Sequence, residues 1–383
     1  MGATQADLAG SLNPAQARAL PGTRGLLVLL ALLGFLATTW LVGWRQGLLW
    51  CVGIGLGVAL AAGSFGFTTG WRVWITHRDP TGLLAQFLGI AVCMLLSVPL
   101  LATHPELQGA DGPLSWSLLI GSFVFGASMQ LADGCGSGTL YKAGLGHPVS
   151  LAVLPAFVAG SFAGSAQLPA WLSLGALPPV SLLHVFGAAG ALVVQLGVLA
   201  LLGALLWRLR RRDAPRRWTG PAVWVAAAAL GVLGALNLVI AGQPWGIVYG
   251  LGLWGAKIVQ AFGVDLSRNA FYGLPVQQAQ LHASVLADNT SITDIAMLFG
   301  ALLAGQRSGR LCRRVRLPRR AWVASVVAGL LMGYSSRLAF GCNVGAYFSG
   351  IATGSLHGWI WFACAFAGSL LGVRLRKQLG VGA

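Results

Sequence analysis

The chain carries one eight-residue pattern twice, as LADGCGSG at residues 131–138 and as LAFGCNVG at residues 338–345. Five of the eight positions agree at an offset of 207, and the shared pattern is L-A-x-G-C-x-x-G. The agreement continues outside the pattern, because Gly126 matches Gly333 at the same offset and residues 160–161 match 368–369 at an offset of 208. Low complexity does not explain two cysteines in register with the glycines, so the sequence indicates two diverged copies of one unit.

The composition excludes a soluble domain. The 383 residues are 56% hydrophobic and only 9% charged, with a mean hydropathy of +0.75, whereas a soluble domain is about 25% charged. A helix needs about 20 apolar residues to cross a bilayer, and the apolar runs predict an all-α, polytopic membrane protein with about nine spans. The 55 glycines suit this class, because glycine lets membrane helices approach each other closely.

The net charge of +16 reflects topology rather than a nucleic-acid partner. Lysine and arginine gather at residues 208–217, 307–320 and 374–377, directly beside apolar segments, as the positive-inside rule predicts for cytoplasmic loops. Residues 103–113 and 166–180 contain neither lysine nor arginine, so we expect them outside the cytoplasm. The pattern predicts a protein of the bacterial inner membrane with both termini in the cytoplasm.

The loop charges also orient the two copies. Residues 114–180 begin and end at loops expected outside, whereas residues 321–373 begin and end at loops expected inside. This predicts two pseudo-symmetric, inverted halves, as in secondary transporters, where the substrate site lies near the midplane. The crossings between residues 217 and 307 fit only with a re-entrant segment, for which the more polar stretch 264–290 is a candidate. The predicted organisation is a polar N-terminal segment without a signal-peptide pattern at 1–24, a first half at 25–207, a basic linker at 208–219, a second half at 220–377 and a tail at 378–383.

The repeated pattern predicts broken helices. Glycine at alternate positions weakens a continuous helix, at a cost of about 1 kcal/mol for each glycine relative to alanine. Such a break at membrane depth is tolerated only inside protein or along a water-filled cavity. The half-helix that follows it offers free N–H groups and a positive dipole end to an anion. The predicted substrate-binding residues at the two breaks are Gly134, Cys135, Gly136 and Gly138, and Gly341, Cys342, Asn343 and Gly345.

Cys135 and Cys342 are distinguished from the other cysteines by their place at the breaks. A thiol is soft and polarisable, so two thiols that face each other are suited to a sulfur-bearing anion. Cys51, Cys93 and Cys364 lie in featureless apolar runs, and we expect them to be small buried hydrophobic residues. The chain has no C-x-x-C pair and no histidine at ligand spacing to a cysteine, so we predict neither a metal site nor a cofactor.

Charged residues near the two breaks are further candidates. Arg337 and Lys142 lie outside the basic runs, and each is predicted to supply positive potential to an anion, with snorkelling to the interface as the alternative. Asp133 is unusual on an anion path, and we expect it either to take up a proton or to pair with a base. We expect Asp294 to cap the helix that begins near Ser291.

Residues 338–359 resemble the signature of the YeeE/YedE family of bacterial membrane transporters, and residues 134–144, 66–72 and 254–257 resemble further motifs of that family. The resemblance covers most of residues 48–377. It implies an hourglass-like assembly of helices with pseudo-symmetric halves, in which thiosulfate passes along cysteines at a narrow centre.

Carried over by motif, the cysteines of the resemblance are Cys135 and Cys342. The thiosulfate importers of the family also have a cysteine in the early motif, where this chain has Gly66. A relay of three thiols is therefore not expected here, and the missing thiol leaves the substrate open.

These observations predict a transporter, not an enzyme, that imports a small sulfur-containing anion, with thiosulfate as the first candidate. A selenium compound or another sulfur oxyanion is the alternative substrate. A membrane sulfurtransferase is the alternative class, because two cysteines can carry a persulfide, although no histidine or carboxylate is placed by spacing to activate Cys342. A purely structural subunit does not need paired helix breaks.

The predicted partners follow from this function. The chain has no G-x-x-x-x-G-K-[ST] motif, so we expect no ATP hydrolysis by the chain itself. We expect the lipid bilayer and the transported anion as partners, and no nucleic acid. No sulfur-carrier domain follows residue 377, so we expect any such cytoplasmic carrier to be a separate protein.

Overall fold

The computed structural model describes residues 23–211, 213, 218, 220–309, 311, 315 and 317–381. Within these residues the chain is almost entirely helical. The elements in chain order are α2 (Thr23–Leu41), α3 (Trp44–Ala62), α4 (Phe67–His77), α5 (Thr81–Thr103), β1 (Leu114–Ser115), α6 (Trp116–Leu131), α7 (Gly136–Gly144), α8 (Pro148–Leu172), β2 (Ala176–Leu177), α9 (Leu182–Arg208), α10 (Ala222–Ala241), α11 (Val248–Ala261), α12 (Pro275–His282), η1 (Val285–Ala287), α13 (Asn289–Ser308), α14 (Arg319–Leu338), η2 (Asn343–Ser349), α15 (Gly350–Ala352) and α16 (Leu356–Leu379).

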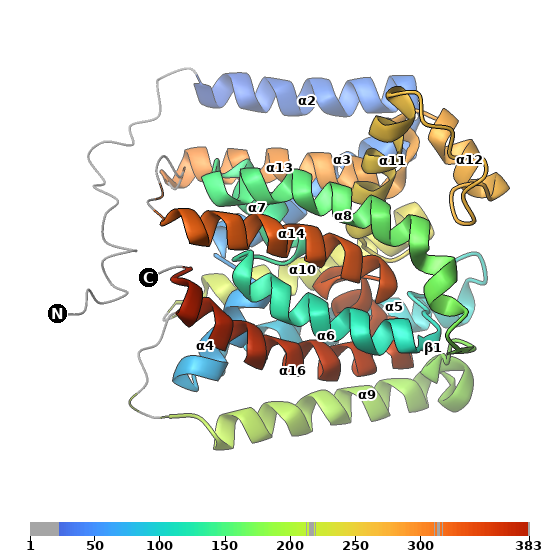
Figure 1. Ribbon diagram of the computed structural model, residues 1–383. Coiled ribbons are helices and arrows are strands. Elements are labelled where there is room, and N and C mark those ends of the chain that lie inside the picture. The colour runs from blue at the N-terminus through green and yellow to red at the C-terminus, as the bar shows by residue number, and fades with distance from the viewer. Residues whose placement is uncertain are drawn as a thin grey trace.

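The described helices confirm an all-α, polytopic membrane protein. In this part of the chain, 7 helices are long and apolar enough to cross a membrane, and the bent pair Arg319–Leu338 and Asn343–Ala352 raises the number to 8. The number is one or two below the nine or so expected, because the apolar helices Gly25–Leu41 and α11 are shorter than a spanning helix. The helices pack with roughly parallel axes, and α2 and α9 lie on opposite outer sides of the bundle (Figure 1).

Helices of the first copy pack against helices of the second. α6 packs against α16, and the equivalent helix α14 packs against α8. Gly126 of α6 meets the backbone of Ala365 on α16, and its repeat partner Gly333 of α14 meets the backbone of Phe157 on α8. Glycine at each crossing lets the two backbones approach, which stabilises helix pairs in a bilayer by close packing. The glycine matches of the sequence therefore mark equivalent helix crossings, and each half of the repeat holds the other in place.

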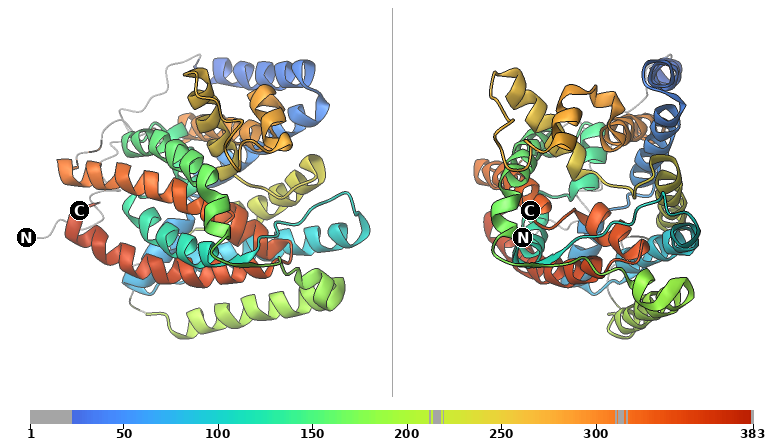
Figure 2. Two further views of the ribbon diagram at one scale, coloured as in Figure 1. Left: turned by 45° about the vertical axis from the view of Figure 1, so that its right-hand side comes forward. Right: turned by 90° about the vertical axis from the view of Figure 1, so that its right-hand side faces the viewer.

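The equivalent helices run in opposite directions. Ser181 and Ser355 form a β-bridge, so α16 begins at the end of the bundle where β1 pairs with β2, between the start of α6 and the end of α8. The Arg320 side chain lies beside Gly380, so α14 begins at the other end, where α16 finishes. Consequently α6 and α14 are antiparallel, as Figure 1 and the turned view in Figure 2 show. The inverted arrangement expected from the loop charges is present.

Between residues 217 and 307, the helix α11 is the element that does not cross the bundle as a full span. The Asn289 side-chain amide donates to the Ala241 carbonyl at 3.2 Å, so α13 begins where α10 ends. α11 has only 14 residues, too few to cross a bilayer, and it lies between these two helices in the chain. The candidate stretch 264–290 instead forms the short helix α12 and the turn η1.

Candidate functional site

The two repeated motifs adopt the same backbone. Asp133 and Phe340 each have a φ of 56°, in the left-handed region. Two residues later, Cys135 (φ −85°, ψ −167°) and Cys342 (φ −100°, ψ −165°) are the extended N-caps of the helices that follow. The first of these is α7, and the second is η2, a π-helix, a conformation that is rare and frequent at functional sites. Both predicted helix breaks are therefore present, and each cysteine lies at the start of a half-helix.

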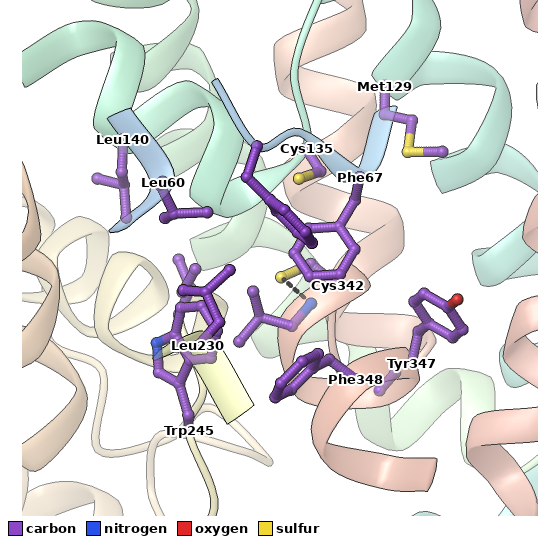
Figure 3. Packing of buried hydrophobic residues seen from close by; sticks show 14 of the residues in the cluster. Leu60, Phe67, Met129, Cys135, Leu140, Leu230, Trp245, Cys342, Tyr347 and Phe348 are labelled. Carbon is purple, nitrogen blue, oxygen red and sulfur yellow. Dashed lines mark hydrogen bonds between the residues drawn. The ribbon is translucent and has the colours of Figure 1, made fainter. Parts of the chain in front are cut away.

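The two breaks touch each other in the buried centre of the molecule. A Cβ atom added at Gly136 would lie only 3.0 Å from Sγ of Cys342 and 3.4 Å from Cγ2 of Ile247. Cys135 is 1% exposed and Cys342 is fully buried, within one hydrophobic cluster. Figure 3 shows both thiols in this cluster, beside the ring of Phe67. The structure thus brings the two predicted cysteines close together in the buried centre of the molecule.

Further helix N-termini reach the same centre. Ser64 has a φ of 46°, and two residues later Gly66 is the extended N-cap of α4. The backbone of the two motifs, a left-handed residue followed by an extended N-cap, therefore occurs a third time, with glycine in place of cysteine. α11 begins directly after Ile247, which lies beside Gly136. Phe67, the first residue of α4, packs edge-on against a ring of η2 with centroids 6.1 Å apart. The N-termini of α4, α7, α11 and η2 meet here, and their free N–H groups and dipoles favour an anion.

A cavity of about 660 Å³ leads to the second break from the loop side expected outside the cytoplasm. Arg337, Phe340, Gly341 and Gly345 contribute to its wall, together with residues of the segments 108–111, 243–249, 280–284 and 287–290. The predicted site residues of the second break therefore face this cavity, except Cys342 and Asn343, which lie deeper.

Arg337 lies in the last turn of α14 and is 9% exposed. Its Nε donates to Oγ of Ser165 at 2.7 Å, and its guanidinium lies 5.0 Å from the ring centre of Tyr249 and 5.7 Å from that of Phe271. No carboxylate of the described residues forms a salt bridge with it. The ring contacts and the serine hold the guanidinium in place, while its positive charge stays available to an anion in the cavity.

A cationic cluster lies on the other side of the thiols. Asp133 forms salt bridges with Arg72 at 2.8 Å, Lys142 at 2.9 Å and Arg376 at 3.1 Å. Lys142 also donates to the Asp133 carbonyl. These cations come from α4, α7 and α16 and are 12–18% exposed. Asp133 therefore pairs with bases, one of its two expected roles, and the group carries two positive charges in excess.

Polar groups without partners surround the thiols. Neither amide atom of the buried Asn343 has a hydrogen-bond partner in the described structure, and neither does Oγ1 of Thr139. Sγ of Cys342 accepts from the Val344 N–H at 3.4 Å, and Sγ of Cys135 lies 3.4 Å from Oγ of Ser137. Groups of this kind offer hydrogen bonds to a passing polar ligand.

The thiols have no base and no metal partner among the described residues. In the described structure, Cys342 bonds to the Val344 N–H and Cys135 lies beside the Ser137 hydroxyl, and neither thiol bonds to a histidine or a carboxylate. No cluster of three potential metal ligands occurs in this part of the chain.

The structure separates two predicted residues and adds others. Arg337 faces the outer cavity and Lys142 pairs with Asp133, so the two residues lie on opposite sides of the thiols rather than at one site. Arg72 and Arg376 are additions to the prediction. Arg72 ends the early motif 66–72, which was a usable signal, whereas Arg376 lies in a basic run that also has a topological explanation. No sequence signal indicated Ile247.

The remaining cysteines of the described chain are not part of this site. Cys51 is exposed, Cys364 is partly exposed, and only Cys93 is buried as expected. The Sγ of Cys93 lies 3.6 Å from Oγ of Ser97, on the same helix. These cysteines supply matched controls for the two buried thiols of the motifs.

Residues 62–371 match the model of a protein family described as Sulphur transport. The probable transporter YedE of Salmonella typhimurium is 30% identical over 149 residues, and that of Escherichia coli is 28% identical over 149 residues. Each match covers 39% of this chain and only 36% of the relative. The thiosulfate transporter TsuA of Spirochaeta thermophila is 27% identical over 332 residues, which cover 81% of this chain and 92% of that protein.

Proposed function

The chain belongs to the Sulphur transport family, whose relatives are named transporters and not enzymes, and we propose that it imports thiosulfate across the bacterial inner membrane. In this proposal the anion passes a central constriction lined by Cys135 and Cys342. The observation that carries the proposal is the contact between the two breaks, where the Cβ position of Gly136 lies 3.0 Å from Sγ of Cys342. This contact gives one closed point at which a substrate meets both thiols.

Positive charge on each side of the constriction supports an anionic substrate. Arg337 faces the cavity on one side without a carboxylate partner, and the Asp133 cluster holds two excess positive charges on the other. Between them lie the converging helix N-termini and the unpaired amide of Asn343. An anion thus leaves one region of favourable potential and enters another, and it meets hydrogen-bond donors where it is stripped of water.

The thiols suit an anion that has a sulfur end. A thiol is a weak donor and a weak acceptor with a polarisable sulfur atom, so it contacts the outer sulfur of thiosulfate without holding it as tightly as a charged group does. Rapid release is needed at a constriction, because a site that conducts must let its ligand leave. No covalent bond between protein and substrate is part of the proposal.

Uptake of radiolabelled thiosulfate into proteoliposomes tests the proposal. We expect Cys342→Ala and Cys135→Ala to lower the initial rate at least about tenfold, a loss of about 1.4 kcal/mol of interaction with the substrate in transit. Cys51→Ala and Cys364→Ala are the matched controls, because both thiols lie outside the centre, and their rates should equal that of the wild type. Full uptake by both centre variants contradicts a constriction lined by cysteines.

Competition with unlabelled anions tests the substrate. Gly66 has the N-cap position that cysteines hold in the two motifs, so the third cap of the centre carries no thiol. We expect unlabelled thiosulfate to compete better than sulfate, sulfite or selenite, because only thiosulfate presents an outer sulfur together with negative oxygens. Stronger competition by selenite reassigns the substrate to the selenium alternative.

A separate cytoplasmic sulfur-carrier protein, as recipient of the imported sulfur, is a further part of the proposal. The Asp133 cluster lies on the side expected to face the cytoplasm and offers positive charge to an acidic partner. Co-purification with candidate carriers, compared between the wild type and Arg72→Ala, tests this part independently of uptake.

A further inference from the structure

Asp294 is a buried carboxyl group without a partner. It lies on α13 and is fully buried, and neither of its two carboxyl oxygens has a hydrogen bond in the described structure. Asp133 differs, because cations surround it, and so does Asp288, whose Oδ2 accepts from the Ser291 N–H at 2.7 Å. Asp288 is the N-cap of α13, so the expectation that Asp294 caps this helix is wrong. Capping therefore does not explain the carboxyl group of Asp294.

Asp294 lies next to the constriction. A Cβ atom added at Gly250 of α11 would lie 3.2 Å from Oδ2 of Asp294, so α11 covers the carboxyl group closely. One turn before Gly250, Ile247 touches the Gly136 position where the two breaks meet. Asp294 is also close enough to Cys342 for the two groups to interact electrostatically. The carboxyl group thus shares a helix contact with the point through which the substrate passes.

The same carboxyl group lies one helical turn from the outer cavity. Thr290, four residues before Asp294 on α13, lines the cavity, as do Asp288 and Asn289. Residues four apart lie on one face of a helix, so Thr290 and Asp294 follow each other inward from the cavity. A proton that enters from the cavity side therefore has about one helical turn to cross before it reaches Asp294.

An unpaired carboxylate at this depth is costly, and the neutral acid is the form that burial tolerates. Ionisable residues inside membrane proteins commonly form proton relays in transporters. Import of a divalent anion moves two negative charges toward a negative interior, which the membrane potential opposes. Each proton that travels inward with the anion cancels one of these charges.

We propose that Asp294 is the proton-binding residue that couples inward movement of a proton to inward movement of the anion. The inference rests on the proposed anion transport and adds its driving ion. Asp294 takes up a proton from the cavity side while the constriction is closed and releases it inward as the anion passes Cys342. No bond other than the O–H bond of the carboxyl group forms or breaks.

The surroundings of Asp294 contain few other titratable groups that could take this role. The nearest such group in the chain is Asp288, the N-cap of α13. Cys342, the N-cap of η2, also lies close to Asp294. Residues 25–41 of α2 contain none. The groups on the other helices packed against α13 are Arg45 and Cys51 on α3, Tyr141 and Lys142 on α7, and Tyr249 and Lys257 on α11. Lys142 is bound to Asp133, and Lys257 donates to the carbonyls of Leu281 and Ala283.

The test uses the full chain in proteoliposomes, with two assays on each variant. Counterflow of labelled thiosulfate at equal pH on both sides measures passage alone, and accumulation driven by an acidic exterior measures coupling to protons. We expect Asp294→Asn to keep counterflow within about threefold of the wild type while its accumulation falls at least about tenfold, because asparagine keeps the shape but has no ionisable proton to bind and release. Asp265→Asn removes an exposed loop carboxyl group whose partner is Ser267, and it should behave as the wild type in both assays.

Two results overturn the proton role of Asp294. In the first, Asp294→Asn accumulates thiosulfate under the pH gradient as the wild type does. In the second, a folded Asp294→Asn protein loses counterflow together with accumulation, which assigns the residue to the anion path instead. Failure of the wild type itself in counterflow is a failure of the proposed substrate, and it is distinguished by the next measurement.

Infrared difference spectroscopy of the purified protein needs no substrate. We expect a carboxylic-acid C=O band that is absent from Asp294→Asn, is present in Asp265→Asn, and weakens reversibly as the pH is raised. A band that stays constant over the whole pH range in which the protein remains folded shows a permanently protonated structural residue and overturns the proposal.

Discussion

Asp133 and Phe340 occupy equivalent positions in the two helix breaks, and each has a φ of 56°, yet their surroundings differ completely. Asp133 pairs with Arg72, Lys142 and Arg376, whereas Phe340 lines the outer cavity. The glycines and cysteines of the motif set the same backbone on both sides of the membrane. The position between them gives each break its own chemistry, a cationic cluster at the first and an aromatic ring in the wall of the outer cavity at the second.

The two breaks also obtain their positive charge differently. At the second break, the cation is Arg337, which lies in the last turn of α14, five residues before Cys342. The equivalent position at the first break is Gln130, a buried residue whose backbone carbonyl accepts from Arg376 at 2.7 Å. The first break therefore obtains its cations from α4, α7 and α16, while the second carries its own. Variants at equivalent positions can show whether this difference matters.

Loss of the carboxylate at the first break should have the largest effect. Asp133→Ala leaves Arg72, Lys142 and Arg376 without their counter-charge, and because the group is largely buried we expect a loss of about 3 kcal/mol of stability. Phe340→Ala at the equivalent position should cost less, since Phe340 is only partly buried. Thermal unfolding in detergent measures both. Asp133→Ala with Lys142→Met should recover part of the loss, and no recovery in this double variant argues against charge as the cause.

The equivalent glycines should tolerate a side chain unequally. Gly341 has a φ of 153°, and a Cβ atom there would lie 2.5 Å from the Ala346 nitrogen, so Gly341→Ala should cost about 2 kcal/mol through backbone strain. At Gly134 the nearest atom would be the Thr139 nitrogen, at 3.1 Å, and Gly134→Ala should cost about 1 kcal/mol or less. Unfolding temperatures of the two variants measure the difference. Equal temperatures would mean that the breaks are as alike in strain as they are in sequence.

A methyl group placed where the breaks meet should impair transport more than stability. Gly136→Ala directs its Cβ at Sγ of Cys342, 3.0 Å away, and narrows the constriction, so we expect about a tenfold loss of uptake rate. Gly197→Ala on the outer helix α9 has no atom within 4 Å of its Cβ position and serves as the control. Thiosulfate uptake and an unfolding curve are recorded for both variants. An unaffected uptake rate in Gly136→Ala would place the substrate path elsewhere.

The smallest effect is expected where only the form of a cation changes. Arg337→Lys keeps the charge but loses the planar group that stacks on Tyr249 and Phe271, a contact worth about 0.7 kcal/mol, so KM for thiosulfate should rise about threefold. Lys142→Arg keeps the charge at the first break and gives the comparison on the other side. Concentration series of initial uptake rates yield both KM values. A larger rise for Lys142→Arg than for Arg337→Lys would argue against Arg337 as a cation that attracts the anion into the outer cavity.

The sequence predicted those parts of the candidate site that depend on local backbone conformation. Gly134, Cys135, Gly341 and Cys342 form the expected breaks because glycine spacing and an unsatisfied helix start are local properties of the chain. Charge asymmetry of the loops predicted the inverted halves, because each loop faces the water on its own side of the membrane. The family match over residues 62–371 agrees with the resemblance that these motifs indicated.

The sequence could not predict contacts made by packing. Arg376 reaches Asp133 across 243 residues of chain, and α6 packs on α16 rather than on its own repeat partner alone. Which side chains meet depends on how the helices cross, and helical periodicity in one segment contains no information about its neighbour. The same reason explains Asp294, whose position in the chain suggested a helix cap. Only the tertiary structure shows that Asp288 caps α13, and that Asp294 is enclosed beneath α11 without a hydrogen-bond partner in the described structure.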